Sequence, residues 1–289
     1  MSSKDAPPPL PDPLPVAVAD SHTHLDMQSS TVEEALVKAG LVGVETVVQV
    51  GCDLEGSRWA AETAARYANV HAAVALHPNE APRIVLGDPE GSSRQGPREA
   101  GGDAALDDAL AEIDRLAALE QVRAVGETGL DFFRTGPEGK EAQERSFRAH
   151  VEIAKRHGKA LVIHDREAHE DVLRVLAEEG APERTVFHCY SGDADMALIC
   201  AERGYYMSFA GNVTFKNARP LRDALAAAPL ELVLVETDAP FLTPAPYRGR
   251  PNAPYLVPVT VRAMAAVRGI GEEEMAAAIA ENTARAFAY

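Results

Sequence analysis

The feature that most constrains this chain is a regular alternation of short apolar, β-rich runs with longer amphipathic segments. Most of the short runs are nearly continuous in Val, Ala, Leu and Ile, which is typical of parallel strands buried on both faces. Eight runs lie at residues 16–20, 44–50, 70–76, 122–127, 160–164, 185–188, 204–209 and 232–236. Helices are expected at residues 31–39, 54–68, 104–119, 140–157, 167–179, 193–203, 218–228, 256–268 and 272–287.

Eight strand–helix units in 289 residues favour one α/β domain, a (β/α)8 TIM barrel over residues 16–289, because such barrels need about 250 residues. An open doubly wound sheet is the alternative fold. Residues 1–15 are rich in proline and predict a poorly ordered tail. Residues 87–103 are rich in Gly, Pro and charge and predict a flexible surface loop.

The charge balance limits the partners of the chain. Lys and Arg number 28 and Asp and Glu number 44, which gives a net charge of −16. A general nucleic-acid binder usually carries a basic face, so a polyanionic substrate would need bound cations and a few local Arg or Lys side chains. The charge also argues against adsorption to anionic membranes.

The cysteine content and the hydropathy bear on location. The three cysteines, Cys52, Cys189 and Cys200, form no CxxC motif, which fits a reducing compartment. The chain contains no run of about 18 apolar residues and no apolar signal core near its start. We therefore expect a cytoplasmic protein with no membrane partner. The size of the predicted barrel also leads us to expect a monomer.

Two histidines follow the first predicted strand in the sequence Asp-Ser-His-Thr-His (20–24). In extended backbone, side chains two residues apart point to the same side, so His22 and His24 could share one metal ion. On a helix the two side chains would lie about 200° apart and could not bind the same metal ion. Taken alone, the pair is also compatible with surface or capping histidines.

Other strand ends carry metal-capable residues too. Glu127, His164, His188 and Asp238 each come at the end of a predicted strand or just after it, and His77-Pro78 follows the third run. Active sites of (β/α)8 barrels assemble at the carboxyl ends of the strands. The sequence therefore predicts a metal site built from six side chains, namely His22, His24, Glu127, His164, His188 and Asp238.

This set of imidazoles and carboxylates suits Zn, Mn, Fe, Ni or Co and is compatible with Mg. Six ligands are too many for one cation, so we predict two divalent metal ions bridged by a carboxylate, about 3.5–4 Å apart. Such a site activates water and binds both the attacking and the leaving oxygen. The predicted chemistry is hydrolysis, above all of phosphate esters.

At these motifs the chain resembles the TatD family of metal-dependent deoxyribonucleases. The resemblance extends over residues 18–289. The matching stretches are DSHTHLD (20–26), LHP (76–78), GETGLDFF (126–133), VIHDREAHEDVL (162–173), FHCYSGD (187–193), GNVTFKNA (211–218), ETDAPFLTP (236–244) and RGRPNAP (248–254). The chain departs from the family pattern at Thr128, where Ile is usual, and at Ala253, where Glu is usual. Neither change removes a ligand.

The resemblance implies a TIM barrel that hydrolyses DNA phosphodiesters, often from the 3′ end, with single strands or 3′ ends as the DNA partner and Mg as the metal in use. It assigns His22, His24 and Asp238 to one metal ion and assigns Glu127 the role of a ligand that bridges the two ions. It assigns His164 and His188 to the second metal ion. His77 would be a substrate contact or an auxiliary ligand at the rim.

We hypothesise that a metal-activated water attacks phosphorus and that Asp238 accepts its proton as general base, with Glu127 as the second catalytic residue. Arg166, Lys216 and Arg248 are candidates to offset charge on the phosphoryl oxygens. Three aromatic side chains lie beside the ligands, and for them packing at the barrel rim is the favoured interpretation over stacking on a base. These are Phe132, Phe133 and Tyr190.

Two other interpretations stay open on the sequence alone. The first is another hydrolase on the same barrel, either an amidohydrolase acting on a cyclic amide, lactone or phosphotriester, or an esterase acting on aminoacylated tRNA. Dinuclear amidohydrolases often have a modified Lys where Glu127 stands here, which favours the TatD-like interpretation. The second is a catalytically silent metal-binding scaffold, against which the intact ligand set argues.

Overall fold

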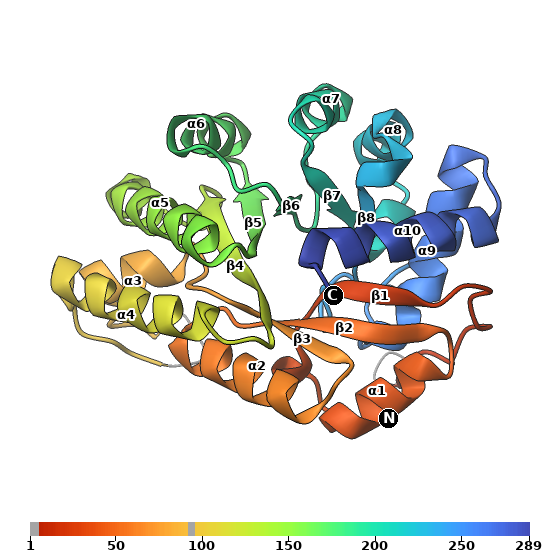
Figure 1. Ribbon diagram of the computed structural model, residues 1–289, viewed down its shortest axis with the longest axis horizontal. Coiled ribbons are helices and arrows are strands. Elements are labelled where there is room, and N and C mark those ends of the chain that lie inside the picture. Colours follow the sequence, from red (N-terminus) through yellow and green to blue (C-terminus); the bar gives the residue numbers. More distant parts are fainter. Residues whose placement is uncertain (1–5, 92–95) are drawn as a thin grey trace. The chain divides into compact units, whose positions relative to one another are not determined.

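Eight strands alternate with helices in the computed structural model, which describes residues 6–91 and 96–289 (Figure 1). The strands are β1 (Val18–Thr23), β2 (Val44–Val50), β3 (Val70–Val74), β4 (Val122–Asp131), β5 (Ala160–Arg166), β6 (Thr185–Phe187), β7 (Tyr206–Phe209) and β8 (Val233–Val235). The helices are α1 (Val32–Gly40), α2 (Leu54–Arg66), α3 (Glu80–Leu86), α4 (Gly102–Ala117), α5 (Lys140–His157), α6 (His169–Glu179), α7 (Ala194–Glu202), α8 (Arg219–Ala227), α9 (Val257–Arg268) and α10 (Glu272–Phe287).

The strand order follows the chain from β1 to β8, which is the order of a (β/α)8 barrel. Every predicted strand is present, which confirms the interpretation of the eight apolar runs. The chain also forms two compact units, and neither is continuous in sequence. The first unit comprises residues up to Gln49, Tyr67–His71 and Val186–Tyr289, and the second comprises Val50–Arg66 and Ala72–Thr185.

The first unit holds β1 and β8 side by side at their carboxyl ends. The backbone N–H of Asp238 donates to the carbonyl of His22 at 2.9 Å, and the N–H of His24 donates to the carbonyl of Ala239 at 2.9 Å. Strand β1 pairs in parallel with β2, and β7 pairs in parallel with both β6 and β8. Helix α10 packs on β1 and β8, and α7 lies beside α8 (Figure 1).

The second unit is built around a long parallel ladder between β4 and β5. This ladder runs from the pair Ala124↔Ala160 to the pair Asp131↔Arg166, and β3 pairs with β4 on the other side. Helix α4 packs against α2, α3 and α5 (Figure 1). Because β4 and β5 extend past the predicted strand ends, the ladder fixes the backbone on both sides of Glu127 and His164.

Helix α3 was not predicted, because its short sequence contains a proline and borders a stretch rich in Gly and Pro. Pro82 lies in the first turn of α3. Backbone N–H groups of a first turn have no acceptor within the helix, so a proline there removes no helical hydrogen bond. Beyond α3, the backbone of Asp88 pairs with that of Arg98 in an antiparallel bridge. The buried Arg83 guanidinium also donates to the Asp88 carboxylate at 2.7 Å and to the Gly96 carbonyl at 3.0 Å.

These contacts tie down the described ends of the segment that we predicted as a flexible loop. Residues 92–95 of this segment lie outside the described residues, and α4 already begins at Gly102.

The predicted N-terminal tail makes contacts with the rest of the chain over residues 6–14, and residues 1–5 of it lie outside the described residues. Prolines lack an N–H and cannot join a sheet, but the carbonyls of this segment accept hydrogen bonds from three side chains. Arg250 donates to the carbonyls of residues 6 and 7, Tyr255 to that of residue 8, and Arg262 to that of residue 12, each at 2.6–2.8 Å. The Leu14 side chain is buried, and its N–H donates to the carbonyl of Val42. Among the described residues, no helix combines the length and the apolar character that crossing a bilayer requires.

Candidate metal centre

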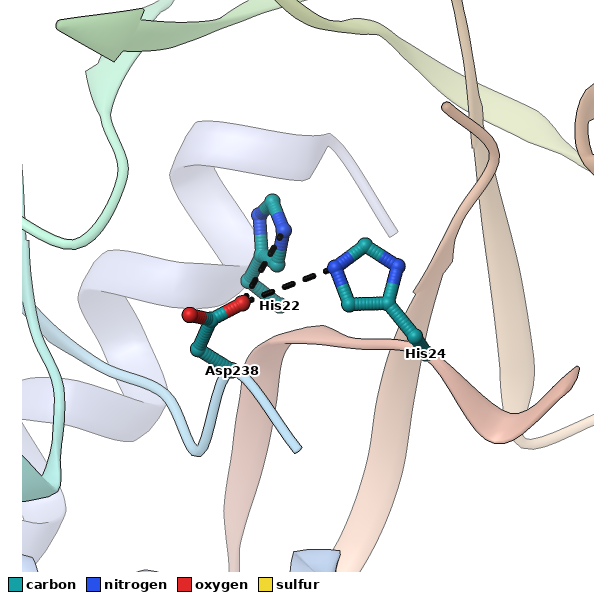
Figure 2. Close-up of side chains that lie close together, drawn as sticks. All are labelled: His22, His24 and Asp238. Atoms are coloured by element: carbon teal, nitrogen blue, oxygen red, sulfur yellow. Dashed lines mark ion pairs between the residues drawn. The ribbon is translucent and has the colours of Figure 1, made fainter. Parts of the chain in front are cut away.

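In the first unit the structure brings together three predicted ligands, His22, His24 and Asp238. Figure 2 shows the Asp238 carboxylate directed at both imidazoles. The Nε2 atoms of His22 and His24 lie 3.9 and 3.5 Å from Asp238 Oδ1. Both histidines are buried, and the Asp238 side chain is 14% exposed. The donor atoms of the three residues therefore surround one point at the edge of solvent.

The local backbone explains this geometry. His22 lies in β1 and His24 directly follows it, so the alternation of the extended chain directs both side chains to one side. Asp238 comes three residues after β8, in a left-handed conformation (φ 51°) that aspartate tolerates better than most residues. Asp20 fixes the turn that leads to it, because its carboxylate accepts hydrogen bonds from the Thr237 N–H and hydroxyl at 2.8 and 2.5 Å. Burial raises the pKa of Asp20 to about 8.

His188 directly follows β6 and belongs to the same group of donors. Its ring stacks on that of His22 with centroids 3.9 Å apart and an interplanar angle of 13°. Its Nδ1 lies 3.2 Å from Oε1 of Glu236, and the same oxygen accepts the Cys189 N–H at 2.9 Å. A carboxylate on Nδ1 favours the tautomer with the ring proton there, which is the form in which the Nε2 of a histidine can bind a metal ion.

The histidines also set the charge state of Asp238. Burial raises the pKa of the Asp238 carboxyl, but the hydrogen bond from His24 and the charges of His22, His188 and His24 outweigh it and hold the pKa below its ordinary value. The carboxylate is therefore ionised near neutral pH. An ionised carboxylate can both bind a cation and accept a proton.

The second unit brings together Glu127 and His164, the predicted ligands of β4 and β5. Oε2 of Glu127 lies 3.1 Å from His164 Nδ1. On the other ring nitrogen, His164 Nε2 lies 3.2 Å from Asp131 Oδ2. Asp131 also accepts the backbone N–H groups of Phe133 and Arg134 and is buried. The carboxylates of Asp131 and Glu127 therefore lie at the two nitrogens of the His164 ring, one at each.

The pKa of Asp131 is consistent with this role. Burial raises the pKa, but the hydrogen bond and charge of His164, together with the donors of Arg134 and Asn79, hold it well below its ordinary value. Asp131 is thus an ionised partner that orients a histidine.

His77 lies close to this pair, with its Nε2 3.8 Å from Glu127 Oε2 and its ring 4.5 Å from that of His164. Its Nδ1 accepts the N–H of Asn79 at 3.0 Å. A neutral imidazole that accepts on Nδ1 carries its proton on Nε2. Of the two roles left open for His77, this arrangement favours a donor to substrate over a metal ligand.

The residues present fit divalent cations by donor type and by spacing. The three donor atoms of His22, His24 and Asp238 lie within 4.8 Å of one another. Bonds from a cation such as Zn²⁺ to imidazole nitrogen and carboxylate oxygen measure about 2.0–2.2 Å, so one ion between these atoms reaches all three after small side-chain movements. Each of the other two histidines, His164 and His188, has a carboxylate on the ring nitrogen that would face away from a metal ion.

The three cations predicted to contact substrate are all exposed. Arg166 is the last residue of β5, two residues beyond His164, and its guanidinium lies over the Phe133 ring with the central carbon 3.8 Å from the ring centroid. Lys216 directly follows Phe215, and the Arg248 guanidinium lies over that ring at 4.4 Å. Arg166 is thus in the second unit, and the other two cations are in the first.

Sequence reasoning missed two residues of the centre. Glu236 directly follows β8, two positions before Asp238, and the spacing rule that singled out His22 and His24 would have identified it. It is fully buried, and its Oε2 has no hydrogen-bond partner within the described part of the chain. Cys52 donates its thiol to Glu127 Oε1 at 3.3 Å, a contact between residues far apart in sequence that no local pattern reveals.

With this geometry in hand, comparison with known proteins gives consistent results. A family model described as TatD related DNase matches residues 19–288. An uncharacterized metal-dependent hydrolase TatD of Mycobacterium tuberculosis is 42% identical over 278 residues, which cover 93% of this chain and 97% of the relative. An uncharacterized metal-dependent hydrolase YcfH of Escherichia coli is 35% identical over 276 residues, 93% of this chain and 95% of the relative. The crystal structure of YjjV, a TatD homologue from Escherichia coli, aligns with a TM-score of 0.81 at 26% identity and covers 94% of this chain and 98% of that one.

The fold is therefore a (β/α)8 barrel of the metallo-dependent hydrolase type, and the chain is a metal-dependent hydrolase. More narrowly, the chain belongs to the family of TatD-related DNases.

Proposed function

We propose that this protein is a deoxyribonuclease that hydrolyses DNA phosphodiester bonds with two divalent metal ions and releases nucleotides from the 3′ end of single strands. The observation that carries the proposal is the convergence of His22, His24 and Asp238 on one point at the carboxyl ends of β1 and β8. Family membership supports the choice of substrate.

The proposed centre uses donors that follow several different strands in the sequence. Active-site residues of (β/α)8 barrels come from the carboxyl ends of several strands. Five of the six predicted ligands lie within two residues of a strand end or just beyond it, and Glu127 lies in the second half of β4. We propose that His22, His24 and Asp238 hold one ion and that His164 and His188 hold the other, with Glu127 between them. Mg²⁺ is the ion we expect in use, and Mn, Zn, Ni, Fe or Co would suit the same ligands.

Divalent ions bound there would act as Lewis acids and lower the pKa of a water molecule. The protein supplies the remaining functions. The Asp238 carboxylate, ionised and 14% exposed, accepts the proton of the attacking water. The Nε2–H of His77 donates to a phosphoryl oxygen. Arg166, Lys216 and Arg248 offset the charge of the neighbouring phosphates.

The test is an activity panel with metal-replete protein on single-stranded DNA, double-stranded DNA, RNA and small esters. We expect release of nucleotides from single-stranded DNA to be fastest. We also expect Asp238→Asn to reduce it by a factor of about 100 or more, because general base catalysis alone contributes about 10²–10⁴-fold. Bound metal is measured in the same samples. Activity of Asp238→Asn within a few-fold of the parent would exclude Asp238 as the base.

Two further results would decide between functions. DNA cleavage that persists in a His22→Ala/His24→Ala double variant would indicate a contaminating nuclease. Hydrolysis of small esters or aminoacyl-tRNA without any cleavage of DNA would replace the proposed function with the esterase alternative.

A further inference from the structure

A cluster of aromatic and cationic side chains lies just beyond the predicted ligands of the second unit. We call it the basic–aromatic rim and define it as Phe132, Phe133, Arg134, Lys140 and Arg166. The Arg166 guanidinium lies over the Phe133 ring at 3.8 Å, and Lys140 Nζ lies over the Phe132 ring at 3.7 Å. Both are within the distance of a favourable cation–π contact.

The exposure of Phe133 is not explained by packing. Phe133 is 55% exposed, which contradicts the expectation that the ring packs at the barrel rim. Because Arg166 covers one face of the ring, much of the exposed area belongs to the opposite face and the edges. A flat apolar face is thus held open to solvent next to a positive charge.

The cations of the rim differ from nearby arginines in their ion pairing. Within the described part of the chain, Arg134, Lys140 and Arg166 have no carboxylate at ion-pair distance, although the chain carries a net charge of −16. Nearby arginines of the same unit behave differently, since Arg148 and Arg174 each pair with several glutamates or aspartates. The rim therefore retains positive charge that an anionic ligand could neutralise.

The backbone fixes the rim next to the candidate ligands. Asp131, which orients His164, faces Arg166 in the ladder between β4 and β5, and the N–H of Phe132 donates to the Arg166 carbonyl at 2.9 Å. The Asp131 carboxylate accepts the N–H groups of Phe133 and Arg134 at 3.1 and 2.9 Å. The same carboxylate thus holds both a predicted metal ligand and the turn that presents the exposed ring.

We propose that the basic–aromatic rim binds an unpaired nucleotide of single-stranded DNA. The base stacks on the open face of Phe133, and the side chains of Arg134, Lys140 and Arg166 contact the flanking phosphates. Stacking platforms beside cations are how proteins bind single strands without reading their sequence. Bases in a duplex are stacked and paired and do not reach such a ring, so the rim selects single strands. This inference rests on the proposed function, because it names the form of DNA that the metal centre receives.

The experiment measures binding and hydrolysis separately in the metal-loaded protein. The binding probe is a single-stranded oligonucleotide with phosphorothioate linkages, which resist cleavage, and with 2-aminopurine near its 3′ end, whose fluorescence falls when the base stacks. The hydrolysis probe is bis(p-nitrophenyl) phosphate, a phosphodiester without a base. The variants are Phe133→Ala, Phe133→Trp and Arg166→Gln. Arg66→Gln, an exposed arginine at the end of α2, is the matched charge control.

We expect Phe133→Ala to raise the dissociation constant of the single strand about 5–100-fold and to abolish the fluorescence decrease. Phe133→Trp should retain both the affinity of the parent and the fluorescence decrease. Arg166→Gln should weaken binding of the single strand, and Arg66→Gln should not. In the two Phe133 variants, duplex binding and the rate on the small diester should stay within about twofold of the parent. Unchanged single-strand binding in Phe133→Ala would overturn the inference, and so would an equal loss on the small diester, which would indicate a purely structural role.

The result also separates this inference from the proposed function. If the parent cleaves DNA and Phe133→Ala binds it normally, the inference fails and the proposed function stands. If the parent cleaves no DNA, the proposed function fails, and the fluorescence of the bound single strand still decides whether the rim stacks on a base.

Discussion

His150 offers a test of how the second unit positions its site residues. It is fully buried on α5, where its Nε2 accepts the N–H of Leu76 at 3.1 Å and its Nδ1 lies 2.7 Å from the Ser146 carbonyl. Leu76 precedes His77, so this neutral ring fixes the backbone that leads to His77, the proposed hydrogen-bond donor to substrate. Burial lowers the pKa of His150 from 6.5 to about 4.

The direction and the size of the change in folding stability with pH follow from these two pKa values. In the unfolded chain the histidine binds a proton below pH 6.5, whereas the folded protein resists protonation until about pH 4. Stability is therefore lost as the pH falls through this window. At about 1.36 kcal/mol per pKa unit, the interval corresponds to about 3 kcal/mol of unfolding free energy by pH 4.

The assay is urea unfolding of the parent and of His150→Gln at several pH values from about 7.5 to about 4.5. We expect the variant to be less stable at neutral pH, because the flexible glutamine amide does not bridge the Leu76 N–H and the Ser146 carbonyl as the rigid ring does. The difference should shrink by about 2–3 kcal/mol toward the acid end. His157→Gln on the same helix is the matched control. A parent–variant difference that stays constant across this pH range would refute the assignment of His150 as a buried neutral ring.

Two further predictions concern the metal centre and the N-terminal segment. Glu236→Gln should lower metal affinity about 10–100-fold in a calorimetric titration, because the carboxylate orients the histidine that follows β6. The exposed Glu231→Gln is its control, and equal affinities in the two variants would exclude the role. Deletion of residues 1–13 should reduce the unfolding free energy by about 1–3 kcal/mol, since Arg250 and Arg262 lose their carbonyl acceptors. Unchanged urea midpoints would show that these contacts contribute nothing.

Much of the fold could be predicted from the sequence because parallel strands buried on both faces leave a strong apolar signature. All eight strands were expected, and the candidate ligands were identified because each comes at or just after a strand end. The same reasoning did not find α3, whose seven residues include Pro82. It also did not find the ordered N-terminal segment, because the hydrogen bonds that hold it come from Arg250, Tyr255 and Arg262, which are distant in sequence.

The polar partners of the site were harder to predict than the ligands. Glu236 orients His188 but was not among the predicted residues, although its place two positions before Asp238 offered a spacing signal. Its contact with a histidine that follows another strand depends on the tertiary structure. The exposure of Phe133 could not be foreseen either, since a phenylalanine beside a strand end is more often packed. Whether an aromatic ring is covered depends on tertiary neighbours, and here the neighbour is Arg166.

The most direct test of the whole account is the position of manganese in crystals of the Mn²⁺-loaded protein, measured by anomalous X-ray scattering. The account predicts two peaks, one within about 2.0–2.4 Å of donor atoms of His22, His24 and Asp238 and the other equally close to His164 and His188. Glu127 should contact both. Peaks bound elsewhere on the protein, or no peak at these residues with saturating Mn²⁺, would contradict it.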